Sequence, residues 1–354
     1  MPADPMEKRE QESDTRPPSG RWFMGSLIGL AVIAGAYVAW WFAAAASLEK
    51  GVDDWIADRR ADGWTVGHRG LAVDGFPFRL NATVDKPFIA GPPERGWDWR
   101  GERLLVTARP WTPHRVRFDL SGRHSGRLPL RTQAQAFDLT APVLTGGLVF
   151  RQGRAQSLSM ETESFALTFD GGDAGSLDIA EGEVHLSPAE DAATGFHLRL
   201  RDLAVAETLR APLGERVRNL MVKGLVTGPI EPAAWPDPVV HWREAGGTVE
   251  VETLDIDYEP LRLTGDGTLA LDEALQPMGA FSVRAQGFFA AIDELVTRGF
   301  MDKRDALGSK LVLGVLSKKP ENGGENYLDL SLTLQDRILY AGPLKVMRFP
   351  IIIW

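Results

Sequence analysis

WFMGSLIGLAVIAGAYVAWWFAAAA, residues 22–46, is an apolar run without a single charged side chain. A 25-residue helix is roughly 37 Å long at ~1.5 Å per residue, which is enough to cross the hydrocarbon core with some tilt. Trp22 lies at one end and Trp40 and Trp41 lie near the other, as expected of aromatic side chains at two water interfaces. The run therefore predicts one transmembrane helix.

A cleaved signal peptide is the alternative interpretation, because the alanines at 43–46 could supply a small-residue cleavage site. The apolar core of a signal peptide is usually about 7–15 residues long, and this run is far longer. The tail at residues 1–21 also mixes acidic and basic side chains, whereas a signal peptide starts with a basic segment. We expect an uncleaved anchor.

The charges on the two sides of the run predict its orientation. Arg16 and Arg21 lie just before it, whereas residues 49–54 carry three acids and one lysine. The positive-inside rule then places the N-terminus in the cytoplasm and the rest of the chain outside it. In a bacterium with two membranes the anchor lies in the inner membrane and the large domain in the periplasm. We expect residues 1–21 to be a disordered cytoplasmic tail.

An amphipathic helix is predicted to continue beyond the anchor, over residues 47–62. Its apolar residues Leu48, Val52, Trp55 and Ile56 follow helical spacing and form one stripe. Gly63 is a typical residue for the end of such a helix. We interpret this segment as a stalk that packs on the domain that follows.

Residues 63–354 are predicted to form one β-rich domain. Apolar and polar side chains alternate along several short segments, which indicates strands with one apolar and one polar face. Turns rich in Gly, Asp and Pro separate them, as in antiparallel sheets. We expect an α+β fold that is mainly an extended, curved antiparallel sheet. The clearest alternating segments are 76–85, 115–120, 196–201, 261–271 and 327–334.

Two or three helices are predicted to interrupt the sheet. Residues 205–220 carry apolar side chains at helical spacing, although Pro212 would kink or split that helix. The apolar stripe over residues 288–300 is more regular, and residues 311–316 form a third.

Bulk composition excludes several classes of function. The chain has 354 residues, a formal net charge of −9 and a pI of about 5.3, so no basic surface for nucleic acid is expected. The absence of cysteine excludes disulfides, zinc–thiolate sites and a thiol nucleophile. The hydrophobic fraction of 44% is ample for a folded core.

Motifs for catalysis are absent as well. The six histidines lack the short spacings of metal-binding pairs, and the sequence contains neither a G-x-S-x-G motif nor a P-loop. Acidic pairs such as Glu161/Glu163 alternate along a strand and indicate a solvated face. We therefore expect no catalytic residue, no cofactor, no metal site and no enzymatic activity.

The apolar faces of the strands are the more informative feature. An open apolar sheet face would suit lipid acyl chains, whereas a helix at 288–300 packed over it would make it an ordinary core. Both interpretations stay open. The candidate lipid-facing residues are Phe76, Phe78, Leu80, Val116, Phe118, Leu328, Leu330 and Leu332.

Two segments resemble a known bacterial family. They are GLAVDGFPFRL at residues 70–80 and LTLQDRILYAGPL at residues 332–344. Together with the preceding helix they resemble domain-of-unknown-function family 2125, which is mainly alphaproteobacterial and would cover nearly the whole chain. This resemblance implies no established activity.

The layout also resembles that of AsmA-type envelope proteins, and residues 264–272 are similar to their strands. The similarity implies non-catalytic envelope lipid handling or assembly, with the inner membrane, phospholipid or other envelope lipids, and envelope proteins as partners. A protein-interaction scaffold of the envelope is the alternative.

Overall fold

The computed structural model describes residues 20–92, 96–130, 133–170, 175–190, 193–206, 211–229, 237–320, 323–342, 344–349 and 351–352. The predicted disordered tail lies outside these residues, apart from its last two, which belong to the first helix.

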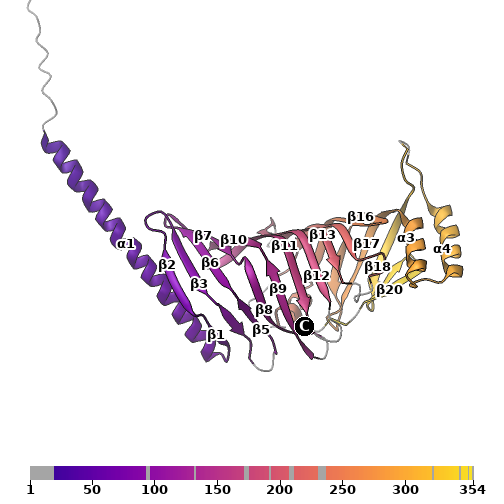
Figure 1. Ribbon diagram of the computed structural model, residues 1–354. Coiled ribbons are helices and arrows are strands. Elements are labelled where there is room, and N and C mark those ends of the chain that lie inside the picture. Colours follow the sequence, from indigo (N-terminus) through magenta and orange to yellow (C-terminus); the bar gives the residue numbers. More distant parts are fainter. Residues whose placement is uncertain are drawn as a thin grey trace, which may run out of the picture.

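The first helix, α1 (Gly20–Ala61), joins the predicted anchor and the predicted stalk in one unbroken element (Figure 1). Its segment from Ser26 onward is long and apolar enough to cross a membrane. Gly63 lies just past the end of the helix, as expected, and its φ is +82°. The amides of Gly63 and Trp64 donate to the carbonyls of Arg60 and Arg59, at 3.1 and 3.0 Å, and so satisfy the free carbonyls of the last turn.

The predicted antiparallel sheet is confirmed, and all the described strands belong to it. Its C-terminal part is a meander in which each strand pairs with its neighbours in sequence. The strands of this meander are β11 (Arg154–Phe169), β12 (Ser176–Pro188), β13 (Thr194–Val205), β14 (Arg216–Val226), β15 (Val249–Tyr258), β16 (Leu261–Leu271), β17 (Pro277–Gln286), β18 (Tyr327–Gln335), β19 (Ile338–Ala341) and β20 (Leu344–Arg348).

Before β11 each long strand of the sheet is interrupted once, so this part of the sheet has two halves side by side; we call the point at β11 where the halves begin the fork, and the halves its branches. The first half of β11 pairs with β10, and its second half pairs with β9. A first branch continues from β10 through β7, β6, β3 and β2, and a second branch continues from β9 through β8, β5, β4 and β1 (Figure 1). The strands of the branches are β1 (Thr65–Gly67), β2 (Gly70–Asp74), β3 (Leu80–Asp85), β4 (Phe88–Ala90), β5 (Asp98–Gly101), β6 (Arg103–Arg109), β7 (Thr112–Asp119), β8 (Gly122–Leu130), β9 (Gln133–Ala141) and β10 (Val143–Arg151).

The fork lies on a line of backbone irregularities. Lys86, Ser164 and Asp202 have φ values of +48°, +54° and +46°, a region that few non-glycine residues adopt. An extra residue in a strand bends it and shifts its alternation by one. In β11 the half-buried apolar residues accordingly change from even positions, such as Met160, to odd positions, such as Phe165. The shift keeps apolar side chains on one face beyond the bend.

Three further helices accompany the sheet. They are α2 (Asp237–Glu244), α3 (Phe288–Thr297) and α4 (Lys303–Leu316), of which the last two were predicted. Trp242 of α2 is buried and donates from Nε1 to the carbonyl of Thr227 at 2.7 Å, so α2 packs at the end of β14. Figure 1 shows α3 and α4 at the end of the sheet farthest from α1.

A small core lies under α3. Phe288 at the start of the helix packs with Ala285 of β17 and Leu328 of β18, and Leu328 is 1% exposed. Leu330 is half-buried against the same cluster. The sheet face is therefore covered by α3 at β17 and β18, which is one of the two arrangements that the sequence left open.

Two local predictions are wrong. The strand predicted over residues 76–85 begins only at Leu80, because Pro77 has no amide for a strand ladder and residues 76–78 form a turn. The helix predicted over residues 205–220 is replaced by strand from Arg216 onward, since that segment pairs with β13 on one side and β15 on the other. Residues 207–210 of that prediction lie outside the described chain.

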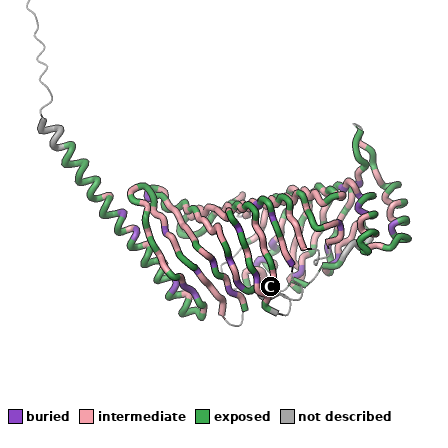
Figure 2. The backbone as a smooth tube through the Cα atoms, in the orientation of Figure 1, coloured by how far each residue is buried: buried purple, intermediate pink, exposed green. Residues whose placement is uncertain are grey.

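The sheet is open. A compact globular protein of 38.8 kDa exposes about 14,000 Å², whereas this chain exposes 23835 Å². The solvent-exposed α1 accounts for part of the difference. In Figure 2 most of the sheet is half-buried or exposed, and few of its residues are fully buried. Among the residues that the structure describes, most of the sheet thus has no second layer.

Candidate functional site: the apolar face of the sheet

The register of the strands aligns apolar residues from one end of the sheet to the other. Residues directly opposite each other in an antiparallel pair point to the same side. Thirteen consecutively paired residues from β2 to β18 are all apolar or glycine, and we call them row one. Row one is Val73, Ala82, Val106, Phe118, Gly146, Met160, Val184, Leu198, Val222, Leu254, Gly265, Val283 and Leu330.

A second row runs beside the first, two residues away along each regular strand. It extends from β3 to β19, and every member is again apolar or glycine. Row two is Leu80, Ala108, Val116, Leu148, Leu158, Leu186, Phe196, Gly224, Val251, Gly267, Phe281, Leu332 and Ala341. The two rows together define the apolar face.

The length of the apolar face exceeds that of one lipid tail. Fourteen strands follow one another from β2 to β19, and at about 4.8 Å per strand spacing they measure about 62 Å. Row members in the centre, such as Leu198 and Phe196, are half-buried. Two of the described helices touch the sheet toward its ends, α1 at β1 and β2 and α3 at β16, and α2 packs at the end of β14.

Aromatic rings fill two of the four glycine positions of the apolar face. A Cβ atom at Gly267 would lie 2.4 Å from Cδ1 of Phe281, and one at Gly146 would lie 2.4 Å from Cζ of Phe118. Each ring therefore lies over its glycine neighbour on the next strand. This arrangement keeps the face smooth where a larger side chain would project.

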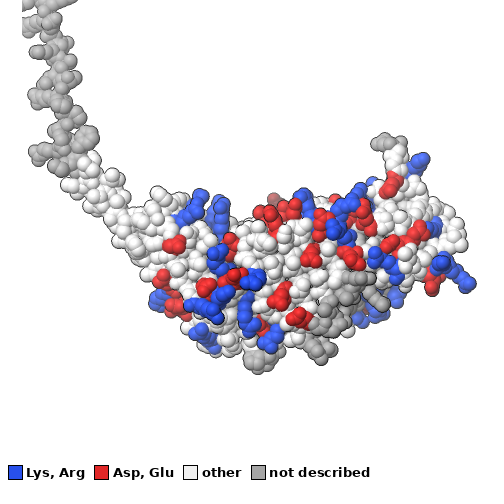
Figure 3. Space-filling model, in the orientation of Figure 1, with Lys and Arg blue, Asp and Glu red and all other residues white. Residues whose placement is uncertain are grey.

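The opposite face is polar and its charges are mixed. Cross-strand ion pairs join Arg201 to Glu181 at 2.6 Å and Lys223 to Glu252 at 3.0 Å. In Figure 3 both signs of charge are interspersed along the sheet rather than gathered in one patch. Solvated pairs of this kind indicate a water-facing surface.

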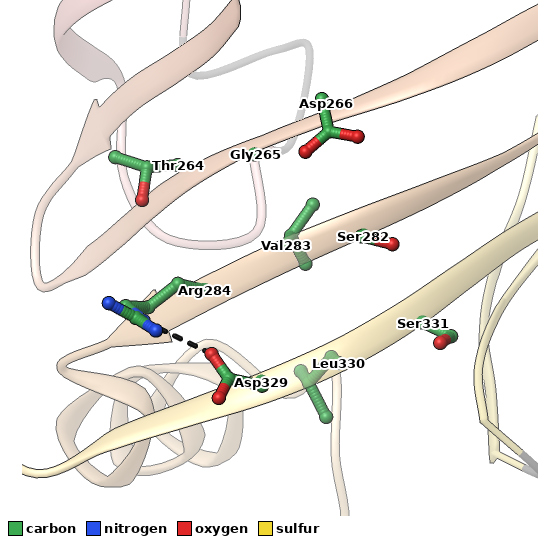
Figure 4. A pocket seen from close by; sticks show the side chains of 9 residues that line it. All are labelled: Thr264, Gly265, Asp266, Ser282, Val283, Arg284, Asp329, Leu330 and Ser331. Carbon is green, nitrogen blue, oxygen red and sulfur yellow. Dashed lines mark hydrogen bonds and ion pairs between the residues drawn. The ribbon is translucent and has the colours of Figure 1, made fainter.

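A shallow hollow of about 390 Å³ lies over β16, β17 and β18 on the polar face (Figure 4). Arg284 and Lys318 both bind the carboxylate of Asp329, at 3.1 and 2.9 Å. These hydrogen bonds, from Lys318 first, lower the pKa of Asp329. Arg284 also lies 4.3 Å above the ring of Tyr327. A neutralised carboxylate between two cations is a surface ion-pair network and offers no free acid or base.

A second hollow, of about 440 Å³, lies over β1, β4 and β5 near α1. At its edge the buried carboxylate of Asp98 accepts hydrogen bonds from Arg100 and Arg127 at 2.8 and 2.5 Å. Next to it the ring of Trp99 stacks on His124. Burial lowers the pKa of His124, and its hydrogen bond to the carbonyl of Leu120 opposes this shift.

The structure places five of the eight candidate residues on the apolar face. Phe118 and Leu330 belong to row one, and Leu80, Val116 and Leu332 belong to row two. Their shared face follows from the alternation seen in the sequence.

The other three candidates lie elsewhere. Leu328 has its place in the core under α3 and is not accessible. Phe76 and Phe78 lie in the turn between β2 and β3 and are 46% and 68% exposed. Phe76 packs against Trp41 of α1, with ring centroids 5.5 Å apart. These two phenylalanines thus belong to the junction between helix and sheet.

The docking of α1 on this turn was not predicted from the sequence. Trp41 is 3% exposed and donates from Nε1 to the carbonyl of Arg79 at 3.0 Å. The hydroxyl of Tyr37 donates to the carbonyl of Pro77. Aromatic residues at the end of an apolar helix are ordinary membrane-interface residues, so only the tertiary structure reveals this second role.

Comparisons with known proteins give one result. Neither the curated proteins nor the solved structures include a match to this chain. Residues 41–350 match the model of the family described as "Uncharacterized protein conserved in bacteria (DUF2125)". This match covers most of the chain, from the docked end of α1 to β20, and the protein therefore belongs to the DUF2125 family.

Proposed function

We propose that this protein is a membrane-anchored, non-catalytic protein of the bacterial envelope that holds lipid acyl chains on its apolar face. The observation that carries the proposal is the pair of unbroken apolar rows on a largely uncovered sheet. Each methylene removed from water contributes about 0.8 kcal/mol, so a long half-buried apolar surface binds an acyl chain favourably. The AsmA-like layout is consistent with such a role.

The junction at α1 supports a direct path from the bilayer to the apolar face. About 20 helical residues span the hydrocarbon core, so a span that starts at Trp22 ends near Trp41. Tyr37 lies four residues earlier, about 6 Å deeper along the helix. The turn that Tyr37 and Trp41 hold would then lie at the membrane surface, with Phe76 and Phe78 directed at lipid.

The proposed location follows from the same helix. The membrane-spanning part is about residues 22–41, shorter than the 22–46 predicted from hydrophobicity alone, because Trp41 and Ala45 are buried against the domain. Arg16 and Arg21 on the preceding side favour a cytoplasmic N-terminus. The sheet would then extend into the periplasm from the inner membrane.

Photo-crosslinking on β13 tests the proposal. A photoreactive amino acid replaces either Leu198, on the apolar face, or the adjacent Arg199, on the polar face, in the full chain reconstituted in phospholipid vesicles. Seven strand spacings, about 34 Å, separate β13 from β2, so adducts there report lipid on the sheet rather than in the bilayer. We expect phospholipid adducts, identified by mass spectrometry, at 198 and few at 199.

Equal labelling at the two positions, or none at either, would overturn lipid binding.

The alternative, an interaction scaffold, has its own structural support in α4. Three of its apolar side chains, Leu311, Val312 and Val315, are 67%, 54% and 86% exposed and offer a contact surface to another protein. In native membranes, where partner proteins are present, protein adducts instead of lipid adducts at position 198 would favour the scaffold.

A further inference from the structure

Three potential metal ligands meet on the polar face in the middle of the sheet. Glu183 and His185 are two residues apart on β12 and point to the same side, and His197 on β13 is directly opposite His185. One ligand atom from each residue lies within 4.8 Å of the others. The two imidazole rings are nearly parallel, at an interplanar angle of 10° and a centroid distance of 6.0 Å.

These side chains lack the partners that their neighbours have. Glu181, one step along the same face, forms an ion pair with Arg201 at 2.6 Å. Arg199 is the register partner of Glu183, but its guanidinium is directed to the sulfur of Met221 at 3.9 Å. Within the described part of the chain no ion pair engages Glu183.

The electrostatics of the neighbouring strand also favour a cation. Glu161 of β11 is directly opposite Glu183. Like charges at directly opposite positions of a sheet destabilise it. A bound divalent cation would relieve this repulsion and use the carboxylate as a ligand.

We propose that Glu183, His185 and His197 bind a divalent transition metal of the zinc class. Two imidazoles and one carboxylate are ligands that Zn²⁺ accepts, and hard cations such as Mg²⁺ and Ca²⁺ prefer oxygen ligands alone. Ligands at 2.0–2.2 Å in a tetrahedron lie about 3.4 Å apart, so side-chain rotation closes the distance that the structure shows. Three protein ligands leave one position for water or for a group from a partner.

This site is separate from the apolar face. Val184 and Leu198, the neighbours of the metal ligands in sequence, point to the opposite side of the sheet. A metal at this point would link β12 to β13 without touching a lipid on the other face. The proposal therefore stands or falls independently of lipid binding.

Titration of the purified full chain in detergent tests the site, after chelator treatment and dialysis. We expect one Zn²⁺ per chain by calorimetry, and bound Co²⁺ to give the visible absorption of a tetrahedral site. His197→Ala and His185→Ala are each expected to weaken binding more than tenfold, since loss of even an outer-shell partner costs 10–100-fold. His241→Ala, on α2, is the matched control and should bind as the wild type does.

Glu183→Gln keeps the shape of the side chain and guards against misfolding of the alanine variants. We expect it to fold normally by circular dichroism and to bind Zn²⁺ less tightly. The proposal is overturned if the wild type binds no Zn²⁺, or if Glu183→Gln and the two histidine variants bind it as tightly as His241→Ala.

Discussion

Nε1 of Trp41 donates a hydrogen bond to the carbonyl oxygen of Arg79 across 3.0 Å and thereby links α1 to the first turn of the sheet. The contact is reinforced by Tyr37 at Pro77 and by the packing of Phe42 on Phe76, with ring centroids 6.0 Å apart. The sheet is therefore held at a fixed orientation to α1 rather than attached through a flexible linker.

Replacement of Trp41 by alanine should release this junction. Truncation of a buried tryptophan costs about 3–5 kcal/mol, and here the loss falls on the contact between α1 and the turn. We expect faster hydrogen exchange over residues 75–79 of the full chain in detergent. Trp40→Ala is the control, because Trp40 is 48% exposed, and its exchange pattern should match the wild type.

Gly267→Val should destabilise the centre of the apolar face. The new side chain would collide with the ring of Phe281 and with the carbonyl oxygen of Ala280, which lies 2.5 Å from the position of a Cβ atom. Overpacking of this kind costs about 1–3 kcal/mol. The measurement is the free energy of unfolding in urea. Asp266→Ala, the neighbouring change on the exposed polar face, should have little effect, and an equal loss would contradict the packing argument.

The core under α3 and the exposed side of α4 should respond differently to substitution. Leu328→Ala removes a side chain that is 1% exposed and should cost about 2–5 kcal/mol of stability. Val315→Lys alters a side chain that is 86% exposed and should change stability by less than about 0.5 kcal/mol. Thermal unfolding of both variants checks this contrast, and a large loss for Val315→Lys would show that α4 is covered.

Stability should fall in mild acid through His124. Burial lowers the pKa of His124 in the folded state, so below the unfolded value of about 6.5 the unfolded chain binds the proton first. The stability that the neutral ring contributes is present above pH ~6.5 and is lost as the pH falls toward the folded pKa. The site suits the neutral ring. Nε2 lies 2.6 Å from the carbonyl oxygen of Leu120, to which it can donate its proton, and the buried Nδ1 has no acceptor among the described residues for a second proton.

Chemical unfolding between pH 7.5 and pH 5 measures this effect. His124→Gln removes the titrating group, so its stability should vary less over this range than that of the wild type. His114→Gln, an exposed position on β7, serves as the comparison and should retain the pH dependence of the wild type. Parallel curves for His124→Gln and the wild type would exclude His124 as the cause.

Alternation in the sequence was enough to predict which residues share a face. Val116 and Phe118, and likewise Leu330 and Leu332, lie on the apolar face because side chains in a strand repeat every two residues. Periodicity does not identify pairing partners, so the fork at β11 was not predictable. The joint pairing of β9 and β10 with one long strand depends on the bend at Ser164, a residue type without a preference for positive φ.

The candidate sites show the same limit. Leu328 has the same local pattern as Leu332, and only the position of Phe288 makes one a core residue and leaves the other on the open face. His185 and His197 are twelve positions apart in the sequence, and their contact requires the register of β12 and β13. The signal in the sequence for this cluster is that both histidines occupy polar positions of alternating strands, and that a short turn joins these two strands.

The number of hairpins in the meander from β11 to β20 determines the length of the sheet. Each strand in it pairs with its sequence neighbours, so a hairpin could be gained or lost during evolution without disturbing the registers on either side. Every hairpin added or removed would change the length of the sheet by about 10 Å, because each hairpin contributes two strands. A chain with more or fewer hairpins would thus extend a different distance from the same junction at α1.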